Sequence, residues 1–528
     1  MSNIDDPQTI GDLIRHQARE LGDQSALSFE GDHLSFRELD EGSNRAANAL
    51  LSLGVERGDR ISYLGKNSHL YFQILAGAAK IGAVMTPVNW RLAKPEVIYV
   101  LNDCQAKVLF IGPGFDEQVA AIEDKLEHIT KIIGAEGPVG EYPGYPEWRD
   151  EFDDTDPHVP ITVDDDAIQL YTSGTTGYPK GAVLTHGSIF SSRMNERDDP
   201  DLMDWQRPVD GEVSMVAMPC FHIAGTGFGL SALFAGSSSV VLSEYDPTQA
   251  LDLIENYNIS KIFMVPAAIQ ILLNHPRVGE VDFSNLKYIF YGASPIPLEL
   301  MKQAMDVLGC GFVQMYGMTE TSGTIVTLNP EDHDPKGNAR MRSVGTPLKD
   351  VEIKVIDEEG NDVPTGTIGE IATRSPKNMK GYWNRPEASE ETIDKEGWLR
   401  TGDAGYLDED GYLYIQDRVK DMIISGGENV YPAEVENALY AHPKVADVAV
   451  IGIPSEKWGE EVKACVVVKP GEELSEAEII AHARENIAGY KCPKSIDFIP
   501  ALPRNPSGKI LRKDLRAPYW DGKARNVN

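Results

Sequence analysis

A run of glycine, serine and threonine that ends in a lysine carries the strongest chemical signal in the sequence. The segment Tyr171-Thr-Ser-Gly-Thr-Thr-Gly-Tyr-Pro-Lys-Gly181 closes an apolar run that begins at Ala167. Glycines let backbone N–H groups turn toward an anion, serine and threonine add hydroxyl donors, and the lysine adds a compact positive charge. A polar surface loop is the alternative interpretation. We expect the loop to hold a triphosphate through Thr172, Ser173, Gly174, Thr175, Thr176, Gly177 and Lys180.

The loop differs from a Walker A loop. That pattern requires a glycine, four residues and then Gly-Lys followed by Ser or Thr. Here Pro179 precedes Lys180 and Gly181 follows it. The sequence therefore predicts a phosphate-binding loop of another class.

Further motifs follow in a fixed order along most of the chain. They are Gln314-Met-Tyr-Gly-Met-Thr-Glu320, Gly381-Tyr-Trp-Asn-Arg-Pro386, Trp398-Leu-Arg-Thr-Gly-Asp403, Asp417-Arg-Val-Lys-Asp-Met-Ile-Ile-Ser-Gly-Gly-Glu-Asn-Val-Tyr-Pro432 and Pro503-Arg-Asn-Pro-Ser-Gly-Lys509. With the phosphate loop, this ordered set resembles the adenylate-forming (AMP-binding) superfamily, in its acyl-CoA and aryl-CoA synthetase branch. An ordered set of motifs is far more specific than any one of them.

The resemblance implies a reaction in two steps. ATP converts a carboxylate into an acyl-AMP with release of pyrophosphate, and a thiol then displaces AMP. Because two anions must meet in the first step, cations are needed at the carboxylate and at the α-phosphate. Lys509 is similar to the catalytic lysine that bridges these groups in the family. The alternative is a solvated lysine in a basic tail beside Arg512 and Lys513.

The resemblance also implies a nucleotide site. Glu320 would position Mg²⁺, which usually has few protein ligands and several phosphate oxygens, and Thr319 would contact phosphate. Tyr316 would lie against the adenine, and Asp403 would accept both ribose hydroxyls. Without the resemblance, Thr319 and Glu320 would be interpreted as a cap, Tyr316 as a core aromatic and Asp403 as part of a turn. The remaining nucleotide residues implied by the resemblance are Gly292, Ala293, Ser294, Gln314 and Arg418.

A hinge and a thiol channel are implied around residue 420. Lys420 resembles the hinge about which the small C-terminal domain rotates between the two steps. After rotation, Ser425, Gly426 and Gly427 would lie beside the pantetheine arm of CoA, in place of Lys509. A β-bulge or a turn is the alternative for the glycines.

The resemblance also places the acid pocket. The implied lining residues are His222, Ala224, Phe228, Gly317, Gly323 and Thr324, and His222 has the alternative of a satisfied core histidine. The segment 221–230 contains no acid, whereas adenylation domains of peptide synthetases usually hold the substrate amine with an aspartate in this region. We therefore expect an apolar pocket for a medium-chain or long-chain fatty acid or an aryl acid.

The elements that position these residues alternate between strands and helices. Strand-like runs at 107–111, 167–171, 213–218, 261–265 and 287–291 are separated by helix-like segments such as 251–257 and 298–308. This order is typical of α/β sheets covered by helices. The charge-free stretch 213–243 is long enough to span a membrane, but its proline and glycines favour buried strands joined by a glycine-rich segment.

The pattern changes in the last third of the chain. Strand-like runs at 351–356, 369–373 and 412–415 are broken by Gly and Asp turns, which predicts an antiparallel β-rich subdomain. A compact α+β pattern follows, with helices at 432–440 and 476–487 and strands at 445–453 and 462–468; Ser475 and Glu478 form a capping box. We expect an N-terminal AMP-binding domain at 1–417, including the β-rich subdomain at about 340–417, and a small mobile domain at 418–528.

Composition limits the classes of partner and compartment. The chain has 528 residues, 49 basic and 82 acidic, with a net charge of −33, which disfavours nucleic acid and acidic membranes as partners. The five cysteines form no C-x-x-C pair, and the first 22 residues lack the apolar core of a signal peptide. We expect a folded cytoplasmic protein without a membrane span that uses ATP, Mg²⁺, CoA and a small carboxylic acid; an oligomer is possible.

Four functions follow from these observations, and the leading one is an AMP-forming acid:CoA ligase. A ligase that loads a separate carrier protein is the first alternative. A luciferase-like oxygenase is less favoured, since the C-terminus lacks Ser-Lys-Leu. A non-catalytic sensor of AMP or acyl groups is difficult to reconcile with the presence of both Lys180 and Lys509.

Overall fold

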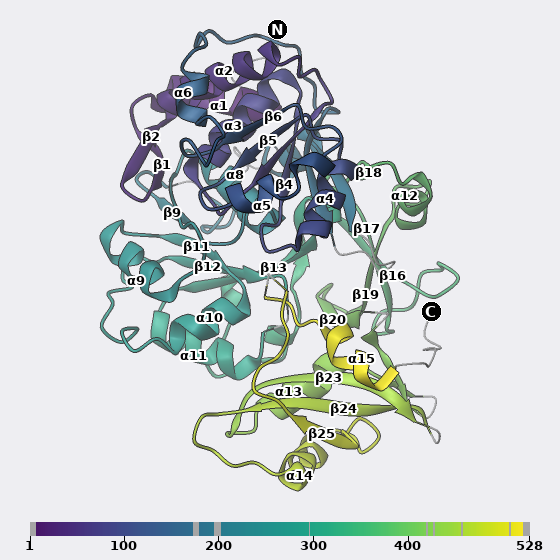
Figure 1. Ribbon diagram of the computed structural model, residues 1–528. Helices are drawn as coiled ribbons and strands as arrows, with labels where there is room; N and C mark the ends of the chain where they lie inside the picture. The colour runs from purple at the N-terminus through teal and green to yellow at the C-terminus, as the bar shows by residue number, and fades with distance from the viewer. Residues whose placement is uncertain are drawn as a thin grey trace.

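The computed structural model describes residues 7–172, 179–194, 202–207, 209–294, 296–418, 421–425, 428–455, 458–505 and 508–520. Its strands form several sheets, and helices pack on them (Figure 1). The large sheet has the order β15 (Thr346–Pro347), β14 (Gly323–Leu328), β13 (Gly311–Met318), β12 (Tyr288–Gly292), β11 (Lys261–Met264), β9 (Val213–Val216), β10 (Ser238–Val241), β1 (Ser25–Phe29), β2 (Asp32–Ser35).

A second sheet is formed by strands of the N-terminal half of the chain and by one later strand, β18. Its order is β18 (Gly381–Tyr382), β8 (Lys180–Thr185), β7 (Asp166–Thr172), β4 (Val84–Val88), β3 (Arg60–Leu64), β5 (Val108–Ile111), β6 (Lys131–Gly134). The helices of these two layers are α1 (Ile10–Leu21), α2 (Phe36–Ser52), α3 (His69–Ile81), α4 (Lys94–Asp103), α5 (Asp116–Ala120), α6 (Tyr145–Arg149), α7 (His186–Met194), α8 (Ile223–Ala235), α9 (Pro247–Asn256), α10 (Pro266–Leu273) and α11 (Leu298–Leu308).

The centre of the large sheet is parallel, as the alternation of strands and helices predicts. Strands β9, β10, β11, β12 and β13 pair in parallel, so their carboxyl ends lie at one edge. The structure confirms the five strands predicted between residues 107 and 291. Strands β9, β11 and β12 lie in the large sheet, and β5 and β7 lie in the second sheet. The two predicted helices are confirmed by α9 and α11. In parallel sheets, ligands bind beyond the carboxyl ends of the strands, which makes this edge the expected place for a site.

The charge-free stretch holds a helix that the sequence pattern did not predict. Strands β9 and β10 are buried as expected, but the glycine-rich segment between them folds as α8. A Cβ atom at Gly225 would overlap the carbonyl oxygen of Met218, and one at Gly229 would overlap the ring of Phe72. The glycines therefore allow the helix to approach its neighbours closely. Among the described helices, none is long and apolar enough to cross a membrane.

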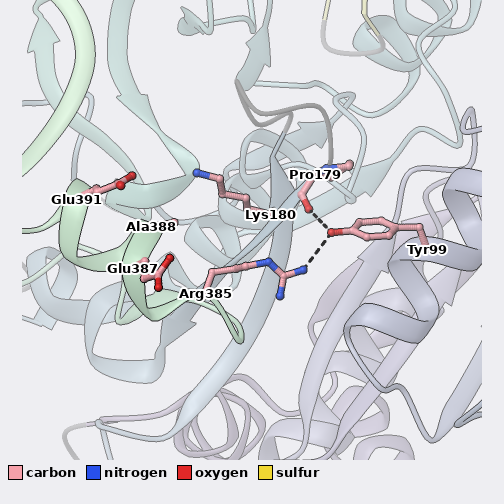
Figure 2. A pocket seen from close by; sticks show the side chains of 7 residues that line it. All are labelled: Tyr99, Pro179, Lys180, Arg385, Glu387, Ala388 and Glu391. Atoms are coloured by element: carbon pink, nitrogen blue, oxygen red, sulfur yellow. Dashed lines mark hydrogen bonds between the residues drawn. The ribbon is translucent and has the colours of Figure 1, made fainter.

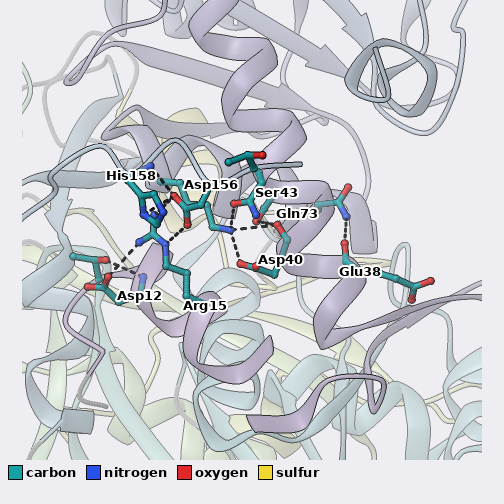
Figure 3. A network of polar contacts seen from close by, with 12 residues as sticks. Asp12, Arg15, Glu38, Asp40, Ser43, Gln73, Asp156 and His158 are labelled. Atoms are coloured by element: carbon teal, nitrogen blue, oxygen red, sulfur yellow. Dashed lines mark hydrogen bonds and ion pairs between the residues drawn. The ribbon is translucent and has the colours of Figure 1, made fainter. Parts of the chain in front are cut away.

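Buried polar contacts connect the N-terminal helices (Figure 3). Arg15 on α1 pairs with Asp156. The side chain of Lys80 on α3 is fully buried, and its Nζ lies 2.5 Å from Oδ1 of Asp40 and 2.6 Å from Oδ1 of Asn44, both on α2. Burial lowers the pKa of Lys80, and Asp40 opposes that shift. The ion pair of Lys80 therefore fixes α3 on α2, and the ion pair of Arg15 fixes α1 on the segment that holds Asp156.

The last third of the chain contains two further sheets. The antiparallel sheet has the order β16 (Glu352–Ile356), β17 (Gly369–Arg374), β19 (Leu399–Leu407), β20 (Leu413–Arg418), and it confirms the predicted β-rich region. Helix α12 (Pro386–Thr392) lies between β18 and β19 in the chain. The C-terminal sheet contains β22 (Glu428–Val430), β21 (Ile423–Ser425), β24 (Gly459–Val468), β23 (Val445–Ser455) and β25 (Ser495–Phe498).

The C-terminal helices pack with this last sheet. They are α13 (Pro432–Tyr440), α14 (Glu476–Asn486) and α15 (Arg512–Trp520). Ser475 and Glu478 form the predicted capping box at the start of α14. Gln270 on α10 joins this region to the large sheet, because its Nε2 donates to the hydroxyl of Tyr440 (2.8 Å) and to the carbonyl of Ala446 (3.1 Å). The exact boundary at residues 417/418 stays a prediction.

Candidate active site

The two ends of the predicted phosphate loop lie on paired strands. Thr172 ends β7, Lys180 begins β8, and the two residues are partners in this antiparallel pair. The two ends of the loop therefore lie opposite each other. The predicted phosphate residues Ser173, Gly174, Thr175, Thr176 and Gly177 lie outside the described residues.

A clamp holds the end of this loop (Figure 2). The hydroxyl of Tyr99 on α4 donates to the carbonyl oxygen of Pro179 at 3.0 Å. Arg385 lies 3.4 Å from the same hydroxyl and pairs with Asp103 at 2.6 Å. Because Arg385 belongs to the motif at 381–386, this motif fixes the residue that precedes Lys180.

A carboxylate lies beside the loop. Glu320 follows β13 in a short 3-10 turn, Thr319–Thr321, and only 5% of its surface is exposed. Its Oε1 accepts from the hydroxyls of Thr172 (3.2 Å) and Tyr382 (2.8 Å). The Nζ of Lys180 lies 4.9 Å from the ring centre of Tyr382, a cation–π distance. The structure therefore brings both ends of the loop together with Glu320.

Tyr382 is a site residue to which sequence reasoning gave no role. It lies in the motif at 381–386, and the signal for it was the motif itself. Its place beside Glu320 depends on the pairing of β18 with β8, where Tyr382 faces Ala182. That pairing joins segments about 200 residues apart, so no local pattern could show it.

A second carboxylate is fixed at the antiparallel sheet. Asp403 on β19 is 7% exposed, and its Oδ2 accepts from the hydroxyl of Tyr316 at 2.8 Å. Its backbone N–H donates to Oγ1 of Thr401. Arg418 is its cross-strand partner on β20. Three of the predicted nucleotide residues, Asp403, Tyr316 and Arg418, therefore lie together.

The end of β12 supplies another part of the predicted nucleotide site. Gly292 is its last residue and pairs with Met315 on β13. Ala293 follows with a φ of 65°, in the left-handed region, and Ser294 comes next. Gln314, another predicted nucleotide residue, lies on the next strand, β13. Its side-chain oxygen accepts a hydrogen bond from the hydroxyl of the buried Tyr291 at 3.3 Å.

The loop of Lys509 lies against the same edge of the large sheet. A Cβ atom at Gly508 would lie 3.2 Å from Cγ2 of Val265, the residue that follows β11. The backbone N–H of Lys509 donates to Oδ1 of Asn505 (2.8 Å), which closes the loop. Adjacent strands lie about 4.8 Å apart, so this loop is roughly 10 Å, two strand spacings, from β13. Lys509 therefore approaches the edge that carries Ala293 and Tyr316.

The predicted hinge and thiol channel are described in part. Ser425 is the buried last residue of β21 and pairs with Gly459 on β24. Lys420, Gly426 and Gly427 lie outside the described residues.

A cavity of about 280 Å³ lies behind the edge of the large sheet. Of the residues predicted to line the acid pocket, Ala224, Phe228, Gly317, Gly323 and Thr324 line this cavity. Ala293 lines it as well, so the cavity adjoins the predicted nucleotide site. Sequence reasoning missed its polar end, which contains Glu212 and Lys261.

His222 lies at the start of α8, next to these lining residues, without lining the cavity itself. Its Nε2 is buried and makes no hydrogen bond to a described residue. Burial lowers the pKa of His222 to about 4, and the charge of Arg91 adds to this shift. The imidazole is therefore neutral at pH 7, and its assignment to the acid pocket stays a prediction.

Comparisons with known proteins place this geometry in a family. The model of the family described as AMP-binding enzyme matches residues 14–383, and the model described as AMP-binding enzyme C-terminal domain matches residues 434–509. The fatty acid–[acyl-carrier-protein] ligase ScoC of Streptomyces coeruleorubidus is 41% identical over 99% of this chain and 98% of that protein. A feruloyl-CoA synthase from an Amycolatopsis species is 38% identical over 97% of this chain and 99% of that protein.

A solved structure agrees with these relatives. ATP-bound MatB from Rhodopseudomonas palustris superposes with a TM-score of 0.87 at 30% identity, covering 98% of this chain and 100% of that one. The α/β body with a small C-terminal unit is thus the fold of known adenylate-forming enzymes, as the motifs predict. The chain belongs to the acyl-CoA synthetase branch of the adenylate-forming superfamily, and it is an AMP-forming enzyme that activates a carboxylic acid as its acyl adenylate.

Proposed function

We propose that this enzyme joins an apolar carboxylic acid to the thiol of CoA through the acyl adenylate. The observation that carries the proposal is the meeting of three groups at one edge of the large sheet. These are the cluster around Glu320, the pair Tyr316 and Asp403, and the loop of Lys509. An anionic nucleotide and an acid bound at this edge would have a cation, hydroxyl donors and a cavity within reach.

Lys509 supplies the charge needed for the first step. The carboxylate oxygen attacks the α-phosphorus and pyrophosphate leaves, so negative charge is redistributed among oxygens that the site must stabilise. The lysine ammonium is a compact charge that can donate to both the carboxylate and the α-phosphate. Holding the two reactants in contact lowers the entropic part of the barrier.

Glu320 is suited to hold Mg²⁺. It offers hard carboxylate oxygen in a buried position, and the hydroxyls of Thr172 and Tyr382 fix one of its two oxygens. Mg²⁺ is usually bound by one or two carboxylates together with substrate phosphates. When bound, the ion would neutralise charge on the phosphates. The residues present therefore fit the cation.

The remaining nucleotide contacts follow from the same geometry. Asp403 accepts the ribose hydroxyls, and the hydroxyl of Tyr316 orients this carboxylate at 2.8 Å. The ring of Tyr316 lies against the adenine. Lys180 and the hydroxyls of the loop bind the outer phosphates.

The second step needs a different arrangement. Lys509 would obstruct the thiol, so we propose that the C-terminal unit rotates about Lys420 and brings the segment of Ser425, Gly426 and Gly427 to the site. Glycines in that segment leave room for the pantetheine arm. The hydrogen bonds from Gln270 on α10 to Tyr440 and Ala446 of the C-terminal unit would then break.

A carrier protein is the second candidate for the acyl acceptor. It is favoured by the 41% identity to ScoC, a ligase named for acyl-carrier protein. CoA is favoured by the 38% identity to a feruloyl-CoA synthase. Both acceptors present the same pantetheine thiol, so the choice between them lies in the surface around the channel.

The test measures both steps and both acceptors. AMP release is followed with ATP, Mg²⁺ and either CoA or a phosphopantetheinylated carrier protein, over fatty, aryl and amino acids. We expect turnover with CoA on an apolar acid. Turnover with the carrier protein alone would establish the second candidate, and absence of both AMP release and pyrophosphate exchange would refute catalysis.

The role of Lys509 is tested in the separate half-reactions. Lys509→Ala should abolish pyrophosphate exchange and leave thioester formation from supplied acyl-AMP largely intact. Lys513→Ala, at an exposed lysine in the same tail, is the matched control and should change neither. Equal loss of both half-reactions in Lys509→Ala would contradict the assigned role.

A further inference from the structure

The walls of the cavity behind the active site are mostly apolar. One face of α8 lines it along the whole helix, from Ile223 to Ala235. The ring of Phe228 packs there against the rings of Phe263 and Phe290, with ring centres 6.3 Å and 5.8 Å away. These walls suit the alkyl or aryl part of an acid.

The register of the large sheet sets the length of the cavity. Lys261 pairs with Tyr288 on β12, and Ala293 lies five residues further along that strand and its extension. At 3.3 Å per residue, the two ends are roughly 16 Å apart. The lining residues of α8 run over 13 residues, or 12 steps of 1.5 Å and roughly 18 Å, which agrees. The cavity thus runs from the carboxyl ends of the strands, where the acid would react, to their amino ends.

The far end of this cavity is polar. Nζ of Lys261 lies 2.9 Å from Oε1 of Glu212, and their side chains are only 10% and 5% exposed. The hydroxyl of Ser237 donates to Oε2 of Glu212 at 3.3 Å. Ser214, the strand partner of Lys261, also lines this end. We name Glu212, Lys261, Ser214 and Ser237 the polar floor.

A purely structural role explains the polar floor poorly. Taking two charges out of water costs several kcal/mol per ion, and apolar side chains of similar volume are often as stable or more stable. The other walls of this cavity show that apolar side chains can fill this part of the sheet. A charged pair facing the end of an apolar cavity is therefore better explained by recognition.

We propose that the polar floor selects carboxylic acids that carry a neutral hydroxyl group at the end remote from the carboxylate. This inference rests on the proposed function. A hydroxyl can donate to Glu212 and accept from Lys261 at once. A second carboxylate on the acid would approach Lys261 only with repulsion from Glu212, and an amine would approach Glu212 only with repulsion from Lys261. The floor thus favours a neutral group that is both donor and acceptor.

The experiment compares acids that differ in this hydroxyl alone. The alkyl pair is 10-hydroxydecanoate and decanoate, and the aryl pair is 4-hydroxycinnamate and cinnamate. We expect the hydroxylated member of at least one pair to have a kcat/KM roughly 10- to 150-fold higher in acid-dependent pyrophosphate exchange, the range of hydrogen bonds to charged groups. The pair with the larger ratio identifies whether the hydroxyl is aliphatic or phenolic.

Variants connect this preference to the polar floor. The double variant Glu212→Gln/Lys261→Met keeps the volumes and removes both charges, so the ratio of the two kcat/KM values should fall to within twofold of one in the folded variant. The matched control is Asp497→Asn/Lys463→Met, a 2.7 Å ion pair of the C-terminal sheet, which should leave the ratio unchanged. If the double variant does not fold, Glu212→Gln alone should lower the ratio at least threefold.

Three outcomes would overturn the inference. The first is a wild-type ratio near one for both pairs while the acids are still adenylated, and the second is an unchanged ratio in the folded variants. The third is a preference for decanedioate or 10-aminodecanoate over 10-hydroxydecanoate. Absence of exchange with every acid would instead refute the proposed function, and the inference with it.

Discussion

Removing the hydroxyl of Tyr382 tests whether the position of Glu320 matters for adenylation. This hydroxyl donates to Oε1 of Glu320 at 2.8 Å, and the carboxylate is 5% exposed, so water cannot readily replace the bond. Tyr382→Phe removes the bond and keeps the ring beside Lys180. Hydrogen bonds to charged groups contribute about 1.5–3 kcal/mol, which corresponds to roughly 10- to 150-fold in rate. Because Thr172 still donates to the same oxygen, we expect the lower end, about tenfold.

The assay is ATP–pyrophosphate exchange at varied Mg²⁺ concentration. Tyr382→Phe should lower kcat/KM for ATP and raise the Mg²⁺ concentration needed for half-maximal rate. Thioester formation from supplied acyl-AMP should be unchanged. Tyr142→Phe is the matched control, since the hydroxyl of Tyr142 donates to Glu123 at the same 2.8 Å on the exposed surface. If Tyr382→Phe stays within twofold of this control, Tyr382 does not position Glu320 for catalysis.

Three further predictions concern the nucleotide and the stability of the body. Asp403→Ala should raise the KM for ATP at least tenfold, since the ribose loses its charged acceptor; an unchanged KM in the exchange assay would remove Asp403 from the ribose site. Asp40→Ala should lower the free energy of unfolding in urea by about 3 kcal/mol, because it leaves Lys80 buried without its charged partner, and the added change Lys80→Met should restore part of the loss. Burial lowers the pKa of His186 to about 4, against about 6.5 in the unfolded chain. Between these two values the unfolded chain binds more protons than the folded chain, so the free energy of unfolding decreases as the pH is lowered. The loss at pH 5 is roughly 2 kcal/mol, and thermal melts should show less pH dependence between pH 7 and pH 5 in His186→Asn.

Local patterns were sufficient for most of the secondary structure. Apolar runs predicted the central strands, and Ser475 with Glu478 predicted the start of α14. Helix α8 was not predicted, because glycine has a low helix propensity and a glycine-rich segment is locally typical of a loop. The glycines are present because α8 packs against Phe72 and the backbone at Met218, contacts that no local window contains.

Site residues could be predicted from the sequence only where they lie in one of the recognised motifs. Glu320, Asp403 and Tyr316 lie in motifs, and the structure adds the hydrogen bonds that fix them. The bond from Tyr382 to Glu320 depends on the pairing of β18 with β8. The pair of Glu212 and Lys261 depends on the register of β9 with β11, across about 50 residues. Neither pairing leaves a periodic signal in the sequence.

The two ends of the acid cavity are controlled by different kinds of interaction. Its length follows from the register of β11 with β12, which the buried apolar pattern of both strands fixes, because a one-residue slip would turn every side chain to the other face. The end group of the acid that the cavity accepts depends on Glu212 and Lys261, two side chains at the amino ends of adjacent strands. A related enzyme could therefore change the end group that it accepts by two substitutions without altering the nucleotide site at the opposite edge. Substrate choice and adenylation chemistry share one sheet, yet they can diverge independently because about 16 Å of strand separates them.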